Sequence, residues 1–343
     1  MKENVWLRIG QRAMTKRVLI TGSSGFLGSH LVKYILKNTD WNLVLLTNFM
    51  HEGIQDRILF AVNEEYLDRV SFIQCDLSSP ISSVTAKKIG HIDYVVNSAS
   101  GSHVDKSISD PANFIINNIS IVCNMLDWAR KAKPEKFIQI STDEVYGPYQ
   151  NRKTSEWDTH LPSSPYSASK AAQEDIAFAY WRTYDVPLII TNTMNLIGEN
   201  QGTEKFTPLV IGKILNDESV DIHTYGDGII GSRDWIYVGN KASAIVHILK
   251  NVDVQHFKDF EKPLRFNVSG DHFSNLEWAK MIANRLGKDL KYQLKDANIV
   301  RPGYDSSYRL DNSKLKDSGW TPEFDIEESL DNVVAWYLEN QEG

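Results

Sequence analysis

Short apolar runs rich in β-branched residues alternate with helical patterns through the first half of the chain, from about residue 17 to residue 193. This alternation is typical of a parallel sheet whose strands are joined by crossover helices. Runs such as Tyr94-Val95-Val96 are apolar without interruption, as expected for strands that are covered on both faces. The strands that the pattern predicts are residues 17–21, 43–47, 70–73, 93–97, 136–141 and 187–193. The sequence thus predicts a doubly wound α/β sheet.

The regular alternation ends after Thr193, where glycines and charged residues become more frequent. Residues 234–250 again follow a strand-then-helix pattern, and residues 326–338 have one apolar face. We therefore expect two domains, with the chain returning to the first before it completes the second. The expected parts are a first domain of residues 15–193 with 234–252, a smaller second domain of residues 194–233 with 253–343, and an N-terminal extension of residues 1–14.

The predicted helix at residues 111–132 carries more apolar side chains than one buried face requires. Two explanations remain open at this point. The helix could be wedged between the sheet and the second domain, or its outer face could meet another subunit.

Composition and charge exclude several classes of protein. The 343 residues carry a formal net charge of −7 and their cations are scattered, so we expect no nucleic-acid and no membrane partner. No run approaches the roughly 18 apolar residues of a membrane span, and residues 1–14 lack the apolar stretch of a signal peptide, which predicts a cytoplasmic protein. Cys75 and Cys123 form no metal-ligand cluster, so we expect buried free thiols and no metal site.

A glycine-rich turn joins the first predicted strand to the first helical pattern. Gly22, Gly25 and Gly28 permit a tight turn, a close approach of the backbone to a pyrophosphate, and close packing of helix on strand. The N-terminus of the following helix attracts phosphate charge. We therefore expect a dinucleotide site that Phe26 and Leu27 also contact. The expected fold class is α/β, a Rossmann-type doubly wound parallel sheet with a smaller C-terminal α/β substrate domain.

The end of the second predicted strand lacks the acidic residue that usually binds the adenosine ribose of NAD. Thr47 and Asn48 stand there instead, and they can hydrogen-bond a ribose hydroxyl without repelling a 2′-phosphate. We therefore expect NAD as the cofactor, and NADP stays open. Asp76 and Leu77, which end the third strand, are candidates for contact with the adenine, although Asp76 could equally be an ordinary helix cap.

Tyr166 and Lys170 lie four residues apart in a predicted helix, which puts them on one face. An ammonium about 4 Å from the phenol, at an effective dielectric of about 20, would favour the phenolate by about 4 kcal/mol, or roughly three pKa units. The spacing therefore predicts that Lys170 lowers the pKa of Tyr166 from about 10 to about 7, where a tyrosine can act as a base. A surface pair is the alternative, because the chain has 14 tyrosines.

Thr142, Asp143 and Glu144 directly follow the fifth predicted strand. The carboxyl ends of strands are where open α/β sheets bind ligands. Two adjacent carboxylates repel each other, and an arrangement that keeps one of them protonated would provide an acid and a base. The alternative is a solvated loop in which Asp143 caps a helix.

Together these residues resemble the extended short-chain dehydrogenase/reductase family, and within it the dTDP-glucose 4,6-dehydratases. The resemblance runs from about Lys16 to Trp336, and its most specific motif is Ser-Thr-Asp-Glu-Val-Tyr-Gly at residues 141–147. The other matching segments are residues 102–107, 162–170, 233–235 and 301–305.

The resemblance implies a nucleotide-sugar 4,6-dehydratase that keeps one NAD tightly bound and regenerates it in each turnover. Tyr166, assisted by Lys170, would take the proton of the C4 hydroxyl, and Thr142 would polarise the same oxygen. Glu144 would take the C5 proton while Asp143 protonates the departing C6 hydroxyl. The substrate would be a nucleotide-diphosphate sugar. The resemblance also implies a homodimer formed through the helices around residues 111–132 and 165–183.

The same resemblance assigns Asn195, Lys205, Arg233 and Arg301 to the nucleotide diphosphate. Arginine provides forked donors that suit phosphate oxygens. We also expect Ala99 to contact the cofactor. The remaining residues expected at the substrate are Ser102, His103, Asn267 and Tyr304.

The chain departs from the pattern of this family around the nucleotide and the cofactor. Thr47 replaces the usual ribose-binding aspartate, Gly101 replaces a glutamate, Tyr304 replaces a histidine, and the turn that begins at Asn195 continues to Glu199. These changes leave the base and the sugar of the substrate open. An NDP-sugar 4-epimerase or a decarboxylase of the same family, or a non-catalytic dinucleotide-binding module, remain as alternatives, and Asp143 beside Glu144 favours dehydration over them.

Overall fold

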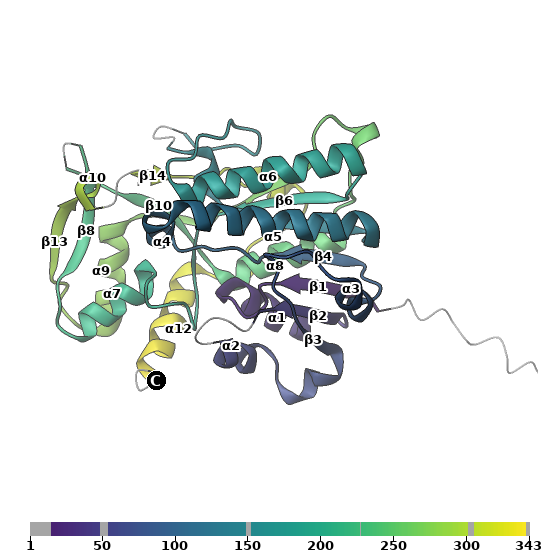
Figure 1. Ribbon diagram of the computed structural model, residues 1–343. Coiled ribbons are helices and arrows are strands. Elements are labelled where there is room, and N and C mark those ends of the chain that lie inside the picture. Colours follow the sequence, from purple (N-terminus) through teal and green to yellow (C-terminus); the bar gives the residue numbers. More distant parts are fainter. Residues whose placement is uncertain (1–14, 49–53, 149–151, 227, 301–304, 341–343) are drawn as a thin grey trace, which may run out of the picture.

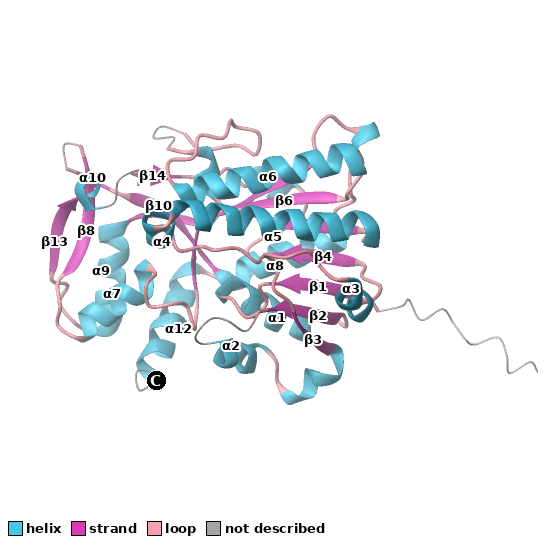
Figure 2. Ribbon diagram, in the orientation of Figure 1, coloured by secondary structure: helices cyan, strands magenta, loops and turns pink. Residues whose placement is uncertain are grey.

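A seven-stranded parallel sheet forms the centre of the protein, in the order β11-β6-β5-β4-β1-β2-β3 (Figure 1, Figure 2). The computed structural model describes residues 15–48, 54–148, 152–226, 228–300 and 305–340. The strands of this sheet are β1 (Arg17–Thr21), β2 (Asn42–Thr47), β3 (Val70–Gln74), β4 (Tyr94–Asn97), β5 (Lys136–Ile140), β6 (Leu188–Thr193) and β11 (Leu264–Val268). The six predicted strands are all present, and the predicted doubly wound sheet is confirmed.

Successive strand residues point into two separate apolar layers. On one face Val18 and Ile20 pack with side chains of α1 (Phe26–Asn38) and α8 (Val238–Asn251), whereas Leu19 packs on the other face with α5 and α6. Helices α5 (Pro111–Ala132) and α6 (Pro165–Tyr184) lie side by side on that second face (Figure 1). Because both faces are covered, the strands are apolar on both sides, which is why their runs lack polar alternation.

The smaller domain is built on two short sheets and three helices around its own core. Trp235 and Trp278 stack there with their ring centroids 4.6 Å apart, beside apolar residues of α7, α9 and α12. Its strands are β7 (Asn195–Ile197), β8 (Val220–Tyr225), β9 (Ile229–Ile230), β10 (Ser232–Tyr237), β12 (Asp271–Ser274), β13 (Tyr292–Asp296) and β14 (Ser307–Tyr308). The remaining helices are α2 (Ile54–Ala61), α3 (Ser83–Ile89), α4 (Val104–Ser109), α7 (Phe206–Leu215), α9 (Asn275–Leu286), α10 (Ala297–Val300), α11 (Ser313–Asp317) and α12 (Ile326–Glu339), with the 3-10 helices η2 (Glu64–Arg69), η3 (Asp143–Tyr146) and η4 (Phe257–Asp259).

The chain returns to the large sheet at a later strand than the sequence pattern predicts. Residues 264–268 fall in the part assigned to the second domain, but they form β11, which pairs in parallel with β6 at the edge of the seven-stranded sheet. Conversely, β10 pairs with strands of the smaller domain, while α8 packs against α1. The apolar pattern of a strand does not say which sheet it joins, so these boundaries could not be placed from the pattern. The predicted extension, residues 1–14, lies outside the described residues.

A buried ion pair fastens β11 to the helix layer near the carboxyl end of β5. Arg265 of β11 and Glu174 of α6 are both excluded from solvent and hydrogen-bonded to each other, and His160 lies 3.0 Å from the same carboxylate. Burial alone would raise the pKa of Glu174, but Arg265 and His160 hold it below its ordinary value. Asn192 joins this cluster to the carbonyl oxygen of Thr142, to which its Nδ2 donates at 2.9 Å. The ion pair therefore supports the loop that follows β5.

In the described ranges, no helix is long and apolar enough to span a membrane, and no three potential ligands gather into a metal site. Cys75 and Cys123 are free thiols, as predicted, but they are half-buried rather than buried. Both pack at the margin of the apolar layer under α5 and α6, which leaves part of each side chain exposed. Burial raises the pKa of both thiols.

Candidate active site

The glycine turn after β1 is shaped to receive a ligand against its backbone. Gly22 has φ +63°, and a Cβ there would lie 2.9 Å from the backbone N and Cα of Ala99. A Cβ on Gly28 would overlap the carbonyl group of Gly22. Gly25 is the N-cap of α1, and because it has no side chain, no capping group stands in front of the first-turn N–H groups. These features fit a pyrophosphate bound at the helix N-terminus.

Thr47, at the end of β2, is joined to the glycine turn. Its hydroxyl oxygen lies 2.7 Å from that of Ser24, and its side chain is buried. Asn48 follows it directly and is half-buried. The structure thus brings the predicted ribose-binding position next to the predicted phosphate-binding turn.

Asp76 is not the helix cap considered as its alternative role, because Ser82 caps α3 and Asp76 makes only a local turn contact. Its carboxylate accepts a hydrogen bond from the backbone N–H of Ser78 at 2.9 Å, and its side chain is exposed. Leu77 is buried, and its carbonyl oxygen accepts a hydrogen bond from Asn124. Phe26 and Leu27 open α1, where the Phe26 ring contacts His30 edge-on.

The five predicted catalytic residues come from the end of β5 and the start of α6. Thr142 caps η3, and its hydroxyl donates to Asp143 Oδ1 at 2.9 Å. Tyr166 lies in the first turn of α6, which begins with a Ser164 capping box. The Tyr166 phenol is hydrogen-bonded to Thr142 and feels the charge of Glu144. Thr142 and Tyr166, which are 24 residues apart in sequence, are therefore in direct contact.

Asp143 is a buried carboxyl group with a neighbouring carboxylate. Only 4% of it is exposed, and burial together with the charge of Glu144 raises its pKa to about 7, while Thr142 and Arg233 act in the opposite direction. At neutral pH such a group is partly protonated, so it can donate a proton. The predicted acid and base pair requires one carboxyl group that keeps its proton, and the raised pKa of Asp143 is in that direction.

The predicted effect of Lys170 on Tyr166 is contradicted. Burial raises the pKa of Tyr166 above its ordinary value, and the Glu144 carboxylate raises it further. The Lys170 ammonium instead donates to the carbonyl oxygen of Ile140 and to Gln173 Oε1, each at 2.7 Å. Burial also lowers the pKa of Lys170, to about 8. The helical spacing correctly places both residues on one face, but it could not show that the ammonium is held by other partners.

Two of the predicted substrate residues meet at the margin of the site. Lys205 Nζ donates to the carbonyl oxygen of Ser102 at 3.1 Å. His103 is the N-cap of α4, where its Nδ1 accepts from the backbone N–H of Lys106. Asn195 begins β7 and pairs with Trp235 of β10.

Arg233 is buried, and its guanidinium donates to the carbonyl oxygens of Ser232, Asp305 and Ser306. Its charge also lowers the pKa of Asp143, so it lies beside the predicted catalytic residues. Asn267 is buried in β11, donates to the carbonyl oxygen of Thr154 and accepts from the Tyr146 hydroxyl.

The predicted residues Arg301 and Tyr304 lie outside the described residues.

Tyr308 is a site residue that sequence analysis missed. Its hydroxyl donates to Asp305, its ring lies 4.8 Å from the Arg233 guanidinium, and burial and the charge of Glu144 raise its pKa. Tyr308 lies in β14 and is in register with Arg233 of β10. A two-residue strand gives no local pattern, and the nearest signal was the matching segment that ends three residues earlier at Asp305.

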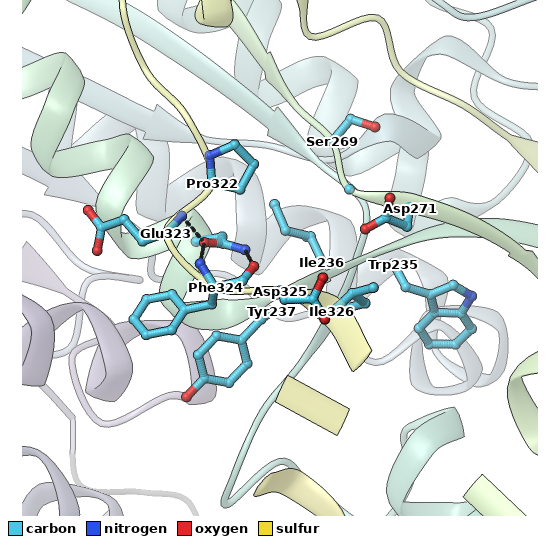
Figure 3. A pocket seen from close by; sticks show the side chains of 12 residues that line it. Trp235, Ile236, Tyr237, Ser269, Asp271, Pro322, Glu323, Phe324, Asp325 and Ile326 are labelled. Carbon is cyan, nitrogen blue, oxygen red and sulfur yellow. Dashed lines mark hydrogen bonds between the residues drawn. The ribbon is translucent and has the colours of Figure 1, made fainter. Parts of the chain in front are cut away.

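A separate pocket of about 320 Å³ lies between β10 and the segment that precedes α12 (Figure 3). Asp271, Glu323 and Asp325 line it, and none of the predicted site residues does. Three carboxylates at one pocket repel a diphosphate. We therefore do not assign the nucleotide of the substrate to this pocket.

Comparisons with known proteins show the family to which the chain belongs. Residues 18–262 match the model of the NAD dependent epimerase/dehydratase family. The low-salt glycan biosynthesis protein Agl12 of Haloferax volcanii is 34% identical over 330 residues, covering 95% of this chain and 99% of that protein. A dTDP-glucose 4,6-dehydratase of Escherichia coli is 32% identical over 357 residues, covering 95% and 94%.

Among solved structures, the dTDP-glucose 4,6-dehydratase DesIV of Streptomyces venezuelae, with NAD bound, matches with a TM-score of 0.82 and 28% identity over 95% of this chain and 98% of that one. A UDP-N-acetylglucosamine 4-epimerase of Methanobrevibacter ruminantium matches with a TM-score of 0.81 and 27% identity over 95% and 99%. The fold is thus similar to that of both a dehydratase and an epimerase.

Because the pKa of Asp143 is raised, we predict that replacing its carboxyl group with an uncharged amide stabilises the folded protein, and that the gain is larger at high pH than at low pH. The unfolded pKa of an aspartate is about 3.9, so the folded protein binds this proton more tightly, and the free energy of unfolding falls as pH rises from about 4 to about 7. Asp143→Asn cannot ionise and should be more stable than the parent chain above pH 7, by about 2–4 kcal/mol at 1.36 kcal/mol per pKa unit. Urea unfolding at pH 5 and pH 8 measures this, and an equal difference at both pH values would contradict the raised pKa.

Proposed function

We propose that this chain, which belongs to the NAD dependent epimerase/dehydratase family, is a nucleotide-sugar 4,6-dehydratase. It converts an NDP-hexose such as dTDP-glucose to the NDP-4-keto-6-deoxyhexose. The observation that carries the proposal is Asp143 beside Glu144 in η3, with the pKa of Asp143 raised to about 7, next to Tyr166 and Thr142. Elimination of water needs one group that gives a proton and another that takes one, and this pair supplies both.

NAD is the cofactor of the proposed reaction. The backbone of Gly22 and Gly28, which leaves no room for a Cβ, and the uncapped start of α1 would hold its pyrophosphate. Thr47 would contact the ribose in place of a carboxylate. When bound, NAD would supply a nicotinamide ring that can take up a hydride from C4 and give it back at C6, so the reaction would consume no external oxidant.

The side chains carry the proton transfers. Tyr166 takes the proton of the C4 hydroxyl, and Thr142, which is hydrogen-bonded to Tyr166, orients the same oxygen. The ketone that results acidifies C5, and Glu144 removes the C5 proton. Asp143 gives its proton to the C6 hydroxyl, which leaves as water. A proton returns to C5 when C6 is reduced. Over the whole reaction the substrate therefore loses one water and nothing else.

We also propose that the chain forms a homodimer through the outer faces of α5 and α6. Ile116 on α5 is 61% exposed, and Ile119 is only half-buried. Contact with a second copy would remove this apolar surface from water. Light scattering behind a size-exclusion column should give twice the mass of one chain, and the mass of a single chain would contradict the dimer.

Mass spectrometry in heavy water tests the proposed reaction. The purified protein is incubated with dTDP-, UDP-, CDP- and GDP-hexoses without added cofactor, and one of them should lose one water and gain one deuterium, because C5 is reprotonated from solvent. Glu144→Gln should abolish water loss while some bound cofactor is still reduced. Glu218→Gln, an exposed carboxylate far along the chain, is the matched control and should keep full turnover.

Unchanged mass with all four substrates, even after NAD or NADP is supplied, would overturn the dehydratase assignment. An isomeric product of unchanged mass would instead identify a 4-epimerase. Full turnover by Glu144→Gln would refute the role of this residue as the C5 base.

The glycine turn gives a test of the cofactor site that does not depend on turnover. Gly28→Ala places a methyl group against the Gly22 carbonyl, so the turn must shift and the protein should be purified with little NAD. Gly212→Ala is the matched control, because the space around Gly212 within α7 is open and alanine favours a helix. NAD released by heating is measured for each variant, and equal amounts in both would contradict the assigned site.

A further inference from the structure

A row of buried polar side chains crosses the centre of the large sheet. Thr21, Asn97 and Gln139 are in register on β1, β4 and β5, and none of them is more than 1% exposed. Thr21 Oγ1 donates to Asn97 Oδ1 at 2.7 Å, and Asn97 Nδ2 donates to Gln139 Oε1 at 2.8 Å. Thr21 directly precedes the glycine turn and accepts the backbone N–H groups of Ser98 and Ala99. The row therefore begins at the proposed cofactor site.

Gln173 of α6 continues this row to Lys170. Its Oε1 accepts from Lys170 Nζ at 2.7 Å and from Gln139 Nε2 at 3.3 Å, and its Nε2 donates to the carbonyl oxygen of Asn118 at 2.7 Å. The side chain of Gln173 is entirely excluded from solvent. Its orientation is unambiguous, because a lysine ammonium only donates and a backbone carbonyl only accepts. Gln173 thus makes three hydrogen bonds to three different elements.

We propose that Gln173 is a positioning residue that fixes the Lys170 ammonium at the active site and couples it through Gln139, Asn97 and Thr21 to the cofactor turn. The inference rests on the proposed function, in which Lys170 assists Tyr166. It names a residue to which neither the sequence motifs nor the family comparison assigns a role.

The geometry explains how Gln173 acts. A lysine has a flexible four-carbon stem and three N–H donors. Two of these donors of Lys170 are directed to Ile140 O and Gln173 Oε1. Two fixed acceptors determine the direction of the third N–H, which is left for the reacting groups. Without Gln173, the buried ammonium would keep the Ile140 carbonyl oxygen as its acceptor and could rotate about that hydrogen bond.

Among the described residues, the one charge that shifts the pKa of Lys170 is that of Glu174, so the two acceptors have a strong influence on its proton. Glu174 on the same helix favours the ammonium and is itself paired with Arg265 and His160. Asp143 and Glu144 approach from η3 and act on Tyr166. The groups that meet Gln173 from β5 and α5 are the uncharged Gln139 and the carbonyl of Asn118. A change of charge at position 173 should therefore act directly on Lys170.

Two variants of opposite effect test the proposal in the NAD-loaded protein. Gln173→Leu removes an acceptor, which disfavours the ammonium, so the alkaline limb of the pH profile of kcat should move down by about one pH unit and kcat should fall about tenfold. Gln173→Glu keeps the acceptor and adds a negative charge, so the same limb should move up by about one pH unit. A role confined to folding predicts no such pair of opposite shifts.

Asn240→Leu is the control for the loss of a buried amide. Asn240 binds the backbone of Glu323 and Phe324, whose hydrogen bonds are drawn in Figure 3, and it does not touch Lys170. This variant should lower the melting temperature without moving the alkaline limb. If both Gln173 variants lower the melting temperature and leave the limb in place, Gln173 is only structural and the proposal fails.

Titration of Lys170 itself separates this proposal from the proposed function. In protein labelled with 13C at lysine Cε, the Lys170 signal is assigned by its loss in Lys170→Met, and its pKa is followed by NMR without any substrate. Opposite shifts in Gln173→Leu and Gln173→Glu would support the positioning role even if no NDP-hexose were turned over. Unchanged titration in both variants would overturn it whatever the activity.

Discussion

The burial of Lys170 is the constraint on which the arrangement of the active site depends. An ammonium that leaves water must find acceptors in the protein, because an uncompensated buried charge is very costly. The acceptors are the Ile140 carbonyl oxygen and Gln173, so α6 must lie over the carboxyl end of β5. Tyr166 stands one helical turn before Lys170, and the same placement brings it to Thr142. The contact of strand end and helix thus assembles the site from two segments that are distant in sequence.

The same burial creates an electrostatic conflict among the acids of the site. Asp143, Glu144 and Tyr166 share one enclosed region, and each negative charge disfavours the next. For Asp143 this is useful, because a carboxyl group that keeps its proton near neutral pH can act as an acid. For Tyr166 it is unfavourable, and none of the groups that shift its pKa among the described residues is a cation. Under the proposed function, the positively charged ring of oxidised NAD would offset this.

Local features of the site could be predicted from sequence, and the long-range ones could not. The glycine turn and the strand ends follow from short patterns, because turn geometry and strand burial depend on neighbouring residues. The Tyr166 and Lys170 spacing correctly gave a shared helix face. The predicted charge interaction between Tyr166 and Lys170 is wrong. The Lys170 ammonium instead donates hydrogen bonds to Gln173, three residues later in the helix, and to the Ile140 carbonyl oxygen at the end of β5.

Other features depend on which distant strands meet, and no local pattern reports that. Residues 264–268 were placed in the second domain and were not predicted as a strand, yet they form β11 at the edge of the large sheet, where the buried Arg265 pairs with Glu174. Tyr308 joins the site through its register with Arg233 rather than through any motif of its own. The phosphate contact expected of Arg233 stays a prediction; in the structure its guanidinium donates to backbone carbonyl oxygens and its charge lowers the pKa of Asp143. The sequence therefore predicts the groups proposed for the chemistry, but little of what holds them in place.

The choice between a dehydratase and an epimerase must come from the proton transfers, because both kinds of enzyme have this fold. Epimerisation at C4 removes a hydride and a hydroxyl proton and returns both, for which Tyr166 suffices. Dehydration also needs a base at C5 and an acid at C6. Under the proposed function, Asp143 and Glu144 would supply these two groups, although placing two carboxyls side by side in this turn destabilises the folded chain. An arrangement that lowers stability is most simply explained by chemistry that needs it, and only the elimination of water needs both of these groups.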